Sequence, residues 1–164
     1  MRSGRTWVAI GAVAVAATVA IVAVALVFGD DESSTSKGEY QTVVANTRDR
    51  VDFALGRLSK AQTLEELLDR MDEAAETIDD SAGDLGGVAP PTELESPHER
   101  LVAELGQLAA DVQGTADQAR VPGFEDILNG AAGLNFESWD KINAILAELR
   151  RQGIEVEPLA RQST

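Results

Sequence analysis

The most constraining feature of this sequence is an apolar run near its N-terminus, VAIGAVAVAATVAIVAVALVF, which extends from Val8 to Phe28. The run contains no charged residue, and only Gly11 and Thr18 fall outside the strongly apolar set. A helix of this length rises roughly 30 Å, which is the thickness of the hydrocarbon core of a bilayer. A helix in a soluble core would need a polar face, and this run has none. The run therefore predicts a single transmembrane helix.

The charges that flank the run predict its orientation. Arginines precede it and carboxylates follow it: Arg2 and Arg5 before, then Asp30, Asp31 and Glu32 after. By the positive-inside rule, the N-terminus lies in the cytoplasm and residues 30–164 lie outside the membrane. We therefore expect residues 1–29 to be an uncleaved signal anchor in the cell membrane of a bacterial envelope.

Secretion after signal cleavage is the alternative. Ala23-Val24-Ala25 has the small-x-small form that signal peptidase needs. This site lies inside the apolar run, however, and Leu26 to Phe28 still follow it. Hydrophobic regions of signal peptides are also shorter, about 7–15 residues. The sequence favours the anchor.

Composition excludes several classes of function. The chain has 28 acidic and 14 basic residues among 164, for a formal net charge of −14. Nucleic acid is excluded as a partner, because phosphate binding needs clustered lysine and arginine. The absence of cysteine excludes disulfides, thiol nucleophiles and cysteine-ligated zinc.

The remainder of the chain has helical periodicity. Residues 30–38 are polar and serine-rich, as in a flexible linker. Residues 39–164 then contain four amphipathic segments, with apolar residues at alternating steps of three and four. These segments cover residues 39–62, 63–87, 96–121 and 135–153. Short connections favour antiparallel neighbours, so we predict an all-α chain in which a transmembrane helix precedes an antiparallel four-helix bundle.

Local signals predict where the helices begin and end. The starts are indicated by Thr63 with Glu66 (a capping box), by Ser96, Pro97 and Glu99 (a second capping box), and by Asn135 as an N-cap. At the last helix end, Gly153 suits a left-handed position, and Ile154 is placed to fold back on Leu149 as in a Schellman motif. Residues 154–159 alternate and predict an extended tail against the bundle. Residues 124–134 have the pattern of one or two further helical turns.

The most acidic segment, residues 63–87, is the first candidate site. The segment contains one basic residue, Arg70, and nine acidic residues: Glu65, Glu66, Asp69, Asp72, Glu73, Glu76, Asp79, Asp80 and Asp84. Hard cations such as Ca²⁺ prefer carboxylate oxygens, but residues 79–84 (DDSAGD) lack the ligand spacing of a calcium loop. We interpret the segment as a solvated acidic face, with a cation site or a basic protein partner as alternatives.

Catalytic chemistry has little support in the sequence. No phosphate-binding loop, nucleophile elbow or zinc-protease motif occurs. The only histidine, His98, lies where a helix is predicted to start, so we assign it a structural role. Trp139 lies on an apolar stripe and is assigned to the core, with a partner groove or a ligand pocket as the alternatives. We therefore predict no catalytic, cofactor-binding or metal-binding residue, and no cofactor.

One resemblance concerns the layout of the whole chain. The N-terminal anchor, the segment PPTEL from Pro90 to Leu94 and the segment HERLVAEL from His98 to Leu105 resemble uncharacterised membrane-anchored or secreted helical proteins of actinobacteria. The resemblance implies an extracytoplasmic helical protein and carries no activity.

Together these features predict a non-enzymatic single-pass envelope protein. Its acidic bundle, residues 39–164, is expected to interact with another envelope protein outside the membrane. The alternative is an extracytoplasmic module that binds or senses a small ligand or cation.

Overall fold

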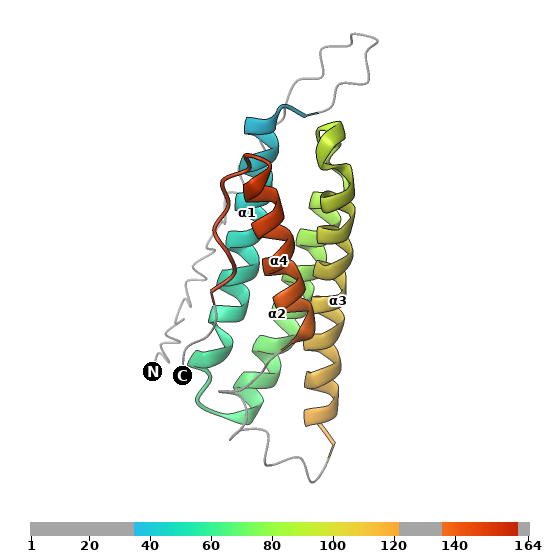
Figure 1. The fold of residues 1–164 in the computed structure, drawn as a ribbon. Coiled ribbons are helices and arrows are strands. Elements are labelled where there is room, and N and C mark those ends of the chain that lie inside the picture. Colours follow the sequence, from blue (N-terminus) through green and yellow to red (C-terminus); the bar gives the residue numbers. More distant parts are fainter. Residues whose placement is uncertain (1–34, 122–135, 161–164) are drawn as a thin grey trace, which may run out of the picture. The chain divides into compact units, whose positions relative to one another are not determined.

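The computed structural model describes residues 35–121 and 136–160, which belong to one compact unit, Glu32–Thr164. The described residues form four α-helices and contain no β-strand (Figure 1), which confirms the all-α prediction. The helices are α1 (Lys37–Gly56), α2 (Leu64–Gly86), α3 (Glu95–Ala119) and α4 (Glu137–Arg151), and two short 3₁₀ turns are η1 (Leu58–Lys60) and η2 (Thr92–Leu94).

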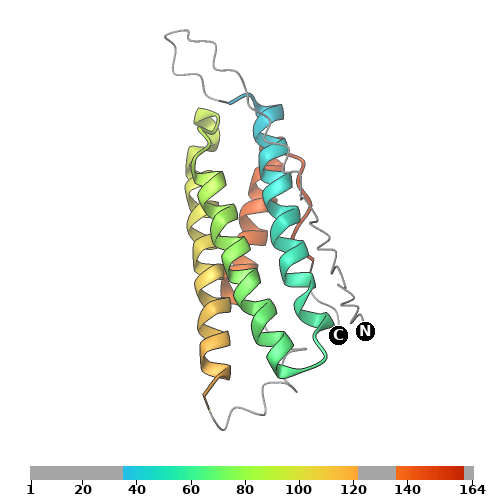
Figure 2. The same cartoon turned by 180° about the vertical axis from the view of Figure 1, so that it is seen from behind.

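The helices form a bundle in which successive helices run in opposite directions. Each helix packs against the next one in sequence, and the most extensive contact joins α2 to α3. In Figure 2, which shows the reverse side, α2 lies in front of α4. Along the remaining seam, between α1 and α4, an extended C-terminal segment runs beside both helices. A helical bundle is thus confirmed for the described part of the chain.

The predicted membrane anchor lies outside the described residues. Within residues 35–121 and 136–160, no helix combines the length and apolar character needed to cross a membrane. The run from Val8 to Phe28 and the predicted turns of residues 124–134 both lie outside the described residues.

The core consists of the apolar faces that the periodicity predicted. The predicted apolar positions of the last helix are all buried: Phe136, Trp139, Ile142, Ile145, Leu146 and Leu149. Those of α2 are buried except the half-buried Leu64: Leu67, Met71, Ala74, Ile78, Ala82 and Leu85. In α1, Tyr40, Val44 and Val51 are fully buried, whereas Phe53 is 69% exposed. Burying such aliphatic and aromatic side chains contributes about 1.5–3 kcal/mol each, so these faces hold the bundle together.

The first helix begins earlier than the sequence analysis predicted. Lys37 and Gly38, which were assigned to the linker, belong to α1. The cause is a capping box in which the Ser36 hydroxyl accepts a bond from the Glu39 backbone and the Glu39 carboxylate accepts one from the Ser36 backbone. At α2, Thr63 caps the helix as predicted, but the Glu66 carboxylate bonds to the Gln62 backbone nitrogen instead of that of Thr63.

The predicted start of α3 is wrong. The helix begins at Glu95, and no side chain caps it. The 3₁₀ turn η2 leads directly into the helix, which places Ser96 and Pro97 in its first turn instead of at its boundary. Proline is tolerated there because the first backbone N–H groups of a helix have no intrahelical acceptor.

The end of α4 is the predicted Schellman motif. Gly153 has a φ of 91°, the left-handed conformation that glycine adopts without strain. The Ile154 backbone N–H donates to the Leu149 carbonyl at 3.0 Å, and the Gly153 N–H donates to the Arg150 carbonyl at 3.1 Å. The chain then continues as the predicted extended tail. At the other end of α4 the N-cap is Phe136, and the predicted cap, Asn135, lies outside the described residues.

Candidate functional site

The acidic residues of α2 fall into two groups with different surroundings. Five of them are exposed, and no lysine or arginine in the described part of the chain lies within ion-pair distance of them. This group, named the α2 stripe, consists of Glu65, Asp69, Glu76, Asp79 and Asp80.

The other four carboxylates of α2 are paired with arginine. The pairs are Glu66–Arg70, Asp72–Arg120, Glu73–Arg57 at 2.8 Å and Asp84–Arg50 at 2.6 Å. Arg50 belongs to α1, Arg57 directly follows α1 and Arg120 directly follows α3, so these three pairs connect α2 to its neighbours. Charge is therefore neutralised where helices meet and left unneutralised on the outward face of α2.

The geometry of the α2 stripe creates local repulsion. Glu65 and Asp69, and likewise Glu76 and Asp80, are four residues apart and therefore adjacent on the helix surface. Like charges at this spacing destabilise a helix by about 0.2–0.5 kcal/mol per pair. The stripe extends roughly 22 Å along the axis at 1.5 Å per residue. Among the described residues, no group of three or more metal-ligating side chains is arranged to hold a metal ion.

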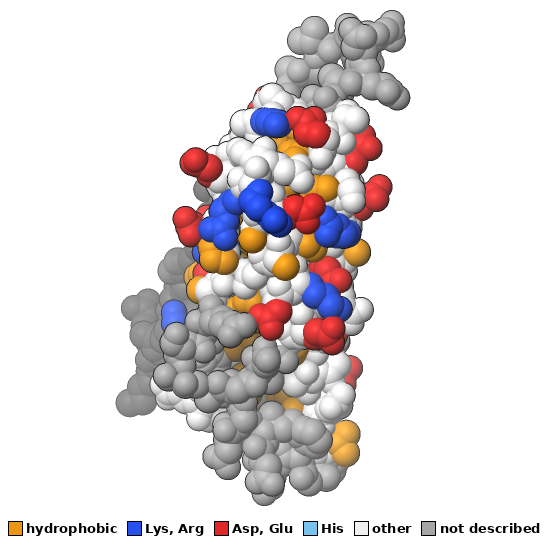
Figure 3. All heavy atoms as spheres, viewed as in Figure 1, with side chains coloured by type: hydrophobic (Ala, Val, Ile, Leu, Met, Phe, Trp, Pro, Cys, Tyr) orange, Lys and Arg blue, Asp and Glu red, His pale blue; other side chains and the backbone are white. Residues whose placement is uncertain are grey.

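Charge is distributed differently on the face formed by α4 and its neighbours. In Figure 3 acidic and basic side chains alternate there, with apolar atoms between them. Arg100 of α3 pairs with Glu148 of α4 at 2.7 Å, which is one such contact across a seam.

His98 lies in the core next to Tyr40. The Tyr40 hydroxyl oxygen is 3.2 Å from His98 Nδ1, and the ring centroids are 5.7 Å apart. Tyr40 is fully buried and His98 is 6% exposed. His98 belongs to the apolar stripe that its spacing from Leu101 and Leu105 predicts, and its burial confirms this prediction. The tyrosine partner was not predicted. The ring therefore connects α3 to α1 and is not presented to a cleft.

Burial determines the protonation of this pair. Burial lowers the pKa of His98, and the nearby Glu99 carboxylate only partly opposes the shift. Burial also raises the pKa of Tyr40 to about 12. A neutral imidazole with its proton on Nε2 accepts a hydrogen bond at Nδ1 from the Tyr40 hydroxyl, which satisfies both buried groups.

This pair predicts a pH dependence of stability. An unfolded histidine has a pKa of about 6.5, so the unfolded chain binds a proton before the folded chain does. The free energy of unfolding should therefore fall as the pH decreases below about 6.5, and level off below the folded-state pKa. Urea unfolding of the full chain in detergent micelles between pH 7.5 and 5 measures this, and His98→Gln should flatten the profile. A wild-type profile without slope in this window would contradict the assignment.

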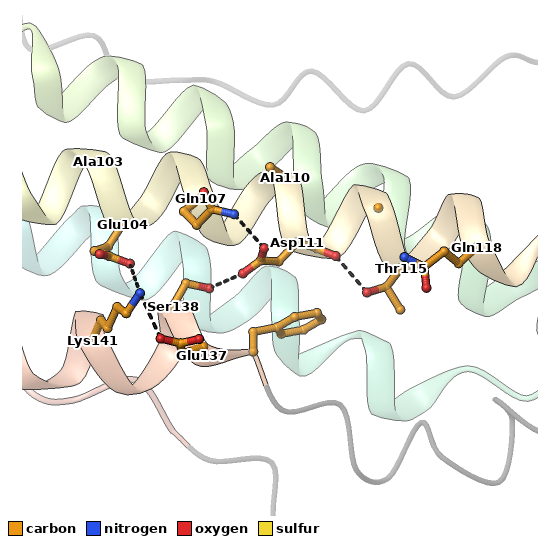
Figure 4. A pocket seen from close by; sticks show the side chains of 12 residues that line it. Ala103, Glu104, Gln107, Ala110, Asp111, Thr115, Gln118, Glu137, Ser138 and Lys141 are labelled. Carbon is orange, nitrogen blue, oxygen red and sulfur yellow. Dashed lines mark hydrogen bonds and ion pairs between the residues drawn. The ribbon is translucent and has the colours of Figure 1, made fainter.

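A polar groove of about 680 Å³ lies between α3 and the start of α4 (Figure 4). Asp111 lies in its centre, where it accepts bonds from Ser138 Oγ at 2.7 Å and Gln107 Nε2 at 2.8 Å. Lys141 Nζ lies 3.2 Å from Glu137 and 4.0 Å from Glu104. The groove is large enough for a small molecule, because ligand pockets typically occupy about 300–1,000 Å³.

The groove has an excess of negative charge. The Glu104, Asp111 and Glu137 carboxylates face one ammonium, that of Lys141, which leaves two unbalanced negative charges. The hydrogen bond to Glu137, with the charge of Glu104, raises the pKa of Lys141 and keeps it protonated. Glu104 Oε2 is shielded from solvent and accepts no hydrogen bond from the described residues. The chemistry of this groove suits an amine.

Trp139 is 6% exposed, which confirms its predicted place in the core. Its indole N–H has no hydrogen-bond acceptor among the described residues. Trp139 does not line the groove, although its neighbour Ser138 does.

The groove and the arginine pairs were not identified from the sequence. Glu104 and Asp111 belong to α3, whereas Ser138 and Lys141 belong to α4, so only the packing of the two helices brings them together. The one sequence signal for the groove was the recurrence of polar residues beside the apolar stripe of each helix. A solvated helix face has the same pattern, so this signal does not distinguish a groove from an ordinary surface.

Comparison of the chain with known protein families, curated proteins and solved structures finds no match.

Proposed function

We propose that this chain is a non-enzymatic, single-pass envelope protein that presents an acidic helical bundle outside the membrane and binds a basic surface of another protein there. The anchor is proposed from the apolar run of Val8 to Phe28 and its flanking charges. The interaction is proposed from the α2 stripe.

The single observation that supports the interaction is the contrast between the two groups of carboxylates on α2. Seam carboxylates such as Asp84 and Glu73 have arginine partners, whereas those of the α2 stripe have none in the described part of the chain. A partner with lysine or arginine at matching spacing would relieve the repulsion within the stripe and increase the association rate. Added salt weakens binding of this kind, because dissolved ions screen the charges. The distance over which charges act, the Debye length, is about 8 Å at 0.15 M and shortens as more salt is added.

Site-specific photo-crosslinking in the native cell tests the interaction. A photoreactive residue in place of Asp79, within the α2 stripe, should capture a specific basic protein, and the yield should fall at higher salt. The control places the same residue at Glu157, which is exposed on the C-terminal tail. Capture of the same proteins from both positions, or from neither, would contradict the proposal.

The proposed topology has its own test, because the chain contains no cysteine. Asn46, which is exposed on α1, is replaced by cysteine. In intact cells this residue should react with a membrane-impermeant maleimide, while Ser3→Cys should react only after lysis. Recovery of the labelled protein in the medium would indicate cleavage and secretion instead of anchoring.

A second candidate function is the binding of a small amine in the groove between α3 and α4, which its volume and excess negative charge favour. A diamine such as 1,4-diaminobutane would place one ammonium group beside the Asp111 carboxylate, in the centre of the groove. Saturating diamine should raise the melting temperature of the full chain, since a ligand at 100 times its Kd adds about 2.7 kcal/mol to stability. Asp111→Asn should reduce this shift, and an unchanged melting temperature at millimolar diamine would exclude the amine.

A further inference from the structure

The seam between α1 and α4 is closed by a segment of the chain itself. Residues 154–160, named the tail, leave the end of α4 and run back along α1 in the direction of that helix (Figures 1 and 2). The order of its contacts gives this direction, since Glu155 bonds to Gln41 and Ala160 bonds to Asp52.

The two helices hold the tail through its backbone. Gln41 Oε1 accepts from the Glu155 N–H at 3.1 Å, Arg48 Nη2 donates to the Pro158 carbonyl at 2.7 Å, Asn143 Oδ1 accepts from the Leu159 N–H at 2.7 Å, and Asp52 Oδ1 accepts from the Ala160 N–H at 2.8 Å. Asn143 Nδ2 also donates to the Leu159 carbonyl, at 3.4 Å. All these bonds end on backbone atoms of the tail, so a segment with other side chains could form the same bonds. A proline would lose only a bond that needs its backbone N–H as donor.

The side chains of the tail alternate between buried and exposed. Ile154, Val156 and Leu159 are at most 3% exposed, whereas Glu155 and Glu157 are exposed. Leu159 borders a void of about 10 Å³ whose other walls are Val44, Thr47, Arg48, Leu101, Leu105, Ile142 and Leu146. The seam thus selects for apolar residues at the first, third and sixth positions and leaves the second and fourth unrestricted.

The connection between α4 and the tail is a single left-handed residue. Gly153 has a φ of 91°, and the tail beyond it contains no helix or strand. A rotation at this residue would release the tail and break the bond from the Ile154 N–H to the Leu149 carbonyl, while the hydrogen bonds within α4 itself would remain.

We propose that the seam between α1 and α4 is a binding site for extended peptides with apolar residues at the first, third and sixth positions, and that the tail occupies this site in cis. A partner segment with this pattern binds when the tail leaves, so the tail acts as an intramolecular competitor. None of the α2 stripe residues takes part in this site. A failure of the peptide-binding proposal would therefore leave the proposed interaction at the α2 stripe untouched, and the reverse also holds.

A peptide-exchange experiment tests the proposal. The probe is a fluorescein-labelled synthetic peptide with the sequence of residues 153–164. The protein is a truncated variant in detergent micelles that keeps residues 1–153. This variant should bind the peptide in fluorescence anisotropy, and the peptide should raise its melting temperature. Asn143→Ala and Arg48→Ala should each weaken binding about tenfold, as expected for lost hydrogen bonds to a backbone. A peptide with aspartate in place of Ile154, Val156 and Leu159 should not bind.

The intact chain provides a second measurement that does not depend on the folding of the truncated variant. The wild-type tail should reduce peptide binding, and Gly153→Ala, which strains the left-handed position, should increase the affinity for the peptide about fivefold. Ile154→Asp, which weakens the tail directly, should increase it further. If the peptide binds neither the truncated chain nor these two variants at millimolar concentration, the tail is a fixed part of the core and the proposal is wrong.

Discussion

Replacing Tyr40 with alanine is expected to lower the free energy of unfolding by about 3–5 kcal/mol, the range for removing a large aromatic side chain from a core. Tyr40 is completely buried, and its hydroxyl is the hydrogen-bond partner of His98 Nδ1. Its removal leaves a cavity and an unpartnered buried nitrogen. Urea unfolding of the full chain followed by far-UV circular dichroism measures the change.

Two control variants separate the contributions of the ring and the hydroxyl. Tyr40→Phe keeps the ring and leaves Nδ1 unpartnered, so we expect a loss of about 1–3 kcal/mol. Phe53→Ala removes an aromatic side chain from the same helix, but this side chain is 69% exposed, and the change should stay within about 0.5 kcal/mol. Equal effects of Tyr40→Ala and Phe53→Ala would contradict the placement of Tyr40 in the core.

The second large effect is expected at the tail, where Ile154→Ala should cost about 2–5 kcal/mol. Ile154 is fully buried, and its backbone N–H completes the Schellman motif at the end of α4. The alanine variant keeps that backbone bond, so its effect reports the packing of the side chain alone.

The adjacent exposed residue provides the matched control for the tail. Glu155 contacts Gln41 through its backbone N–H, and Glu155→Ala removes only the side chain, so this contact is kept. Its effect should stay within about 0.5 kcal/mol. A small effect at Ile154, similar to that at Glu155, would show that the tail is not packed in solution.

The sequence predicted the helices well where one periodic signal dominated. The apolar stripe of α4 follows from spacing alone, because a regular helix turns each such position toward the core. The same spacing predicts the burial of His98 near the start of α3. The Schellman motif at Gly153 was equally predictable, since few residues other than glycine adopt its backbone conformation.

Helix starts and contacts between helices were less predictable. At α3 the capping pattern at Ser96 does not mark the boundary, because the 3₁₀ turn η2 leads directly into the helix at Glu95. The Tyr40–His98 bond joins residues that are far apart in sequence, and its formation depends on how α1 and α3 align. The division of the α2 carboxylates into paired and unpaired groups depends in the same way on where arginines such as Arg50 and Arg120 lie in the bundle.

The α2 stripe is the basis of the proposed interaction, and the most direct measurement is partner capture by two charge-matched variants. Glu76→Gln/Asp80→Asn removes two adjacent charges of the stripe, and Glu155→Gln/Glu157→Gln removes two exposed charges of the tail. With the photoreactive residue at position 79, the stripe variant should lose about tenfold in crosslinking yield, which corresponds to 1.4 kcal/mol. It should also become slightly more stable, by about 0.2–0.5 kcal/mol, because a repulsive pair is gone. The tail variant should retain both wild-type values, and an equal loss of yield in the two variants, or no loss in the stripe variant, would contradict a basic partner at the α2 stripe.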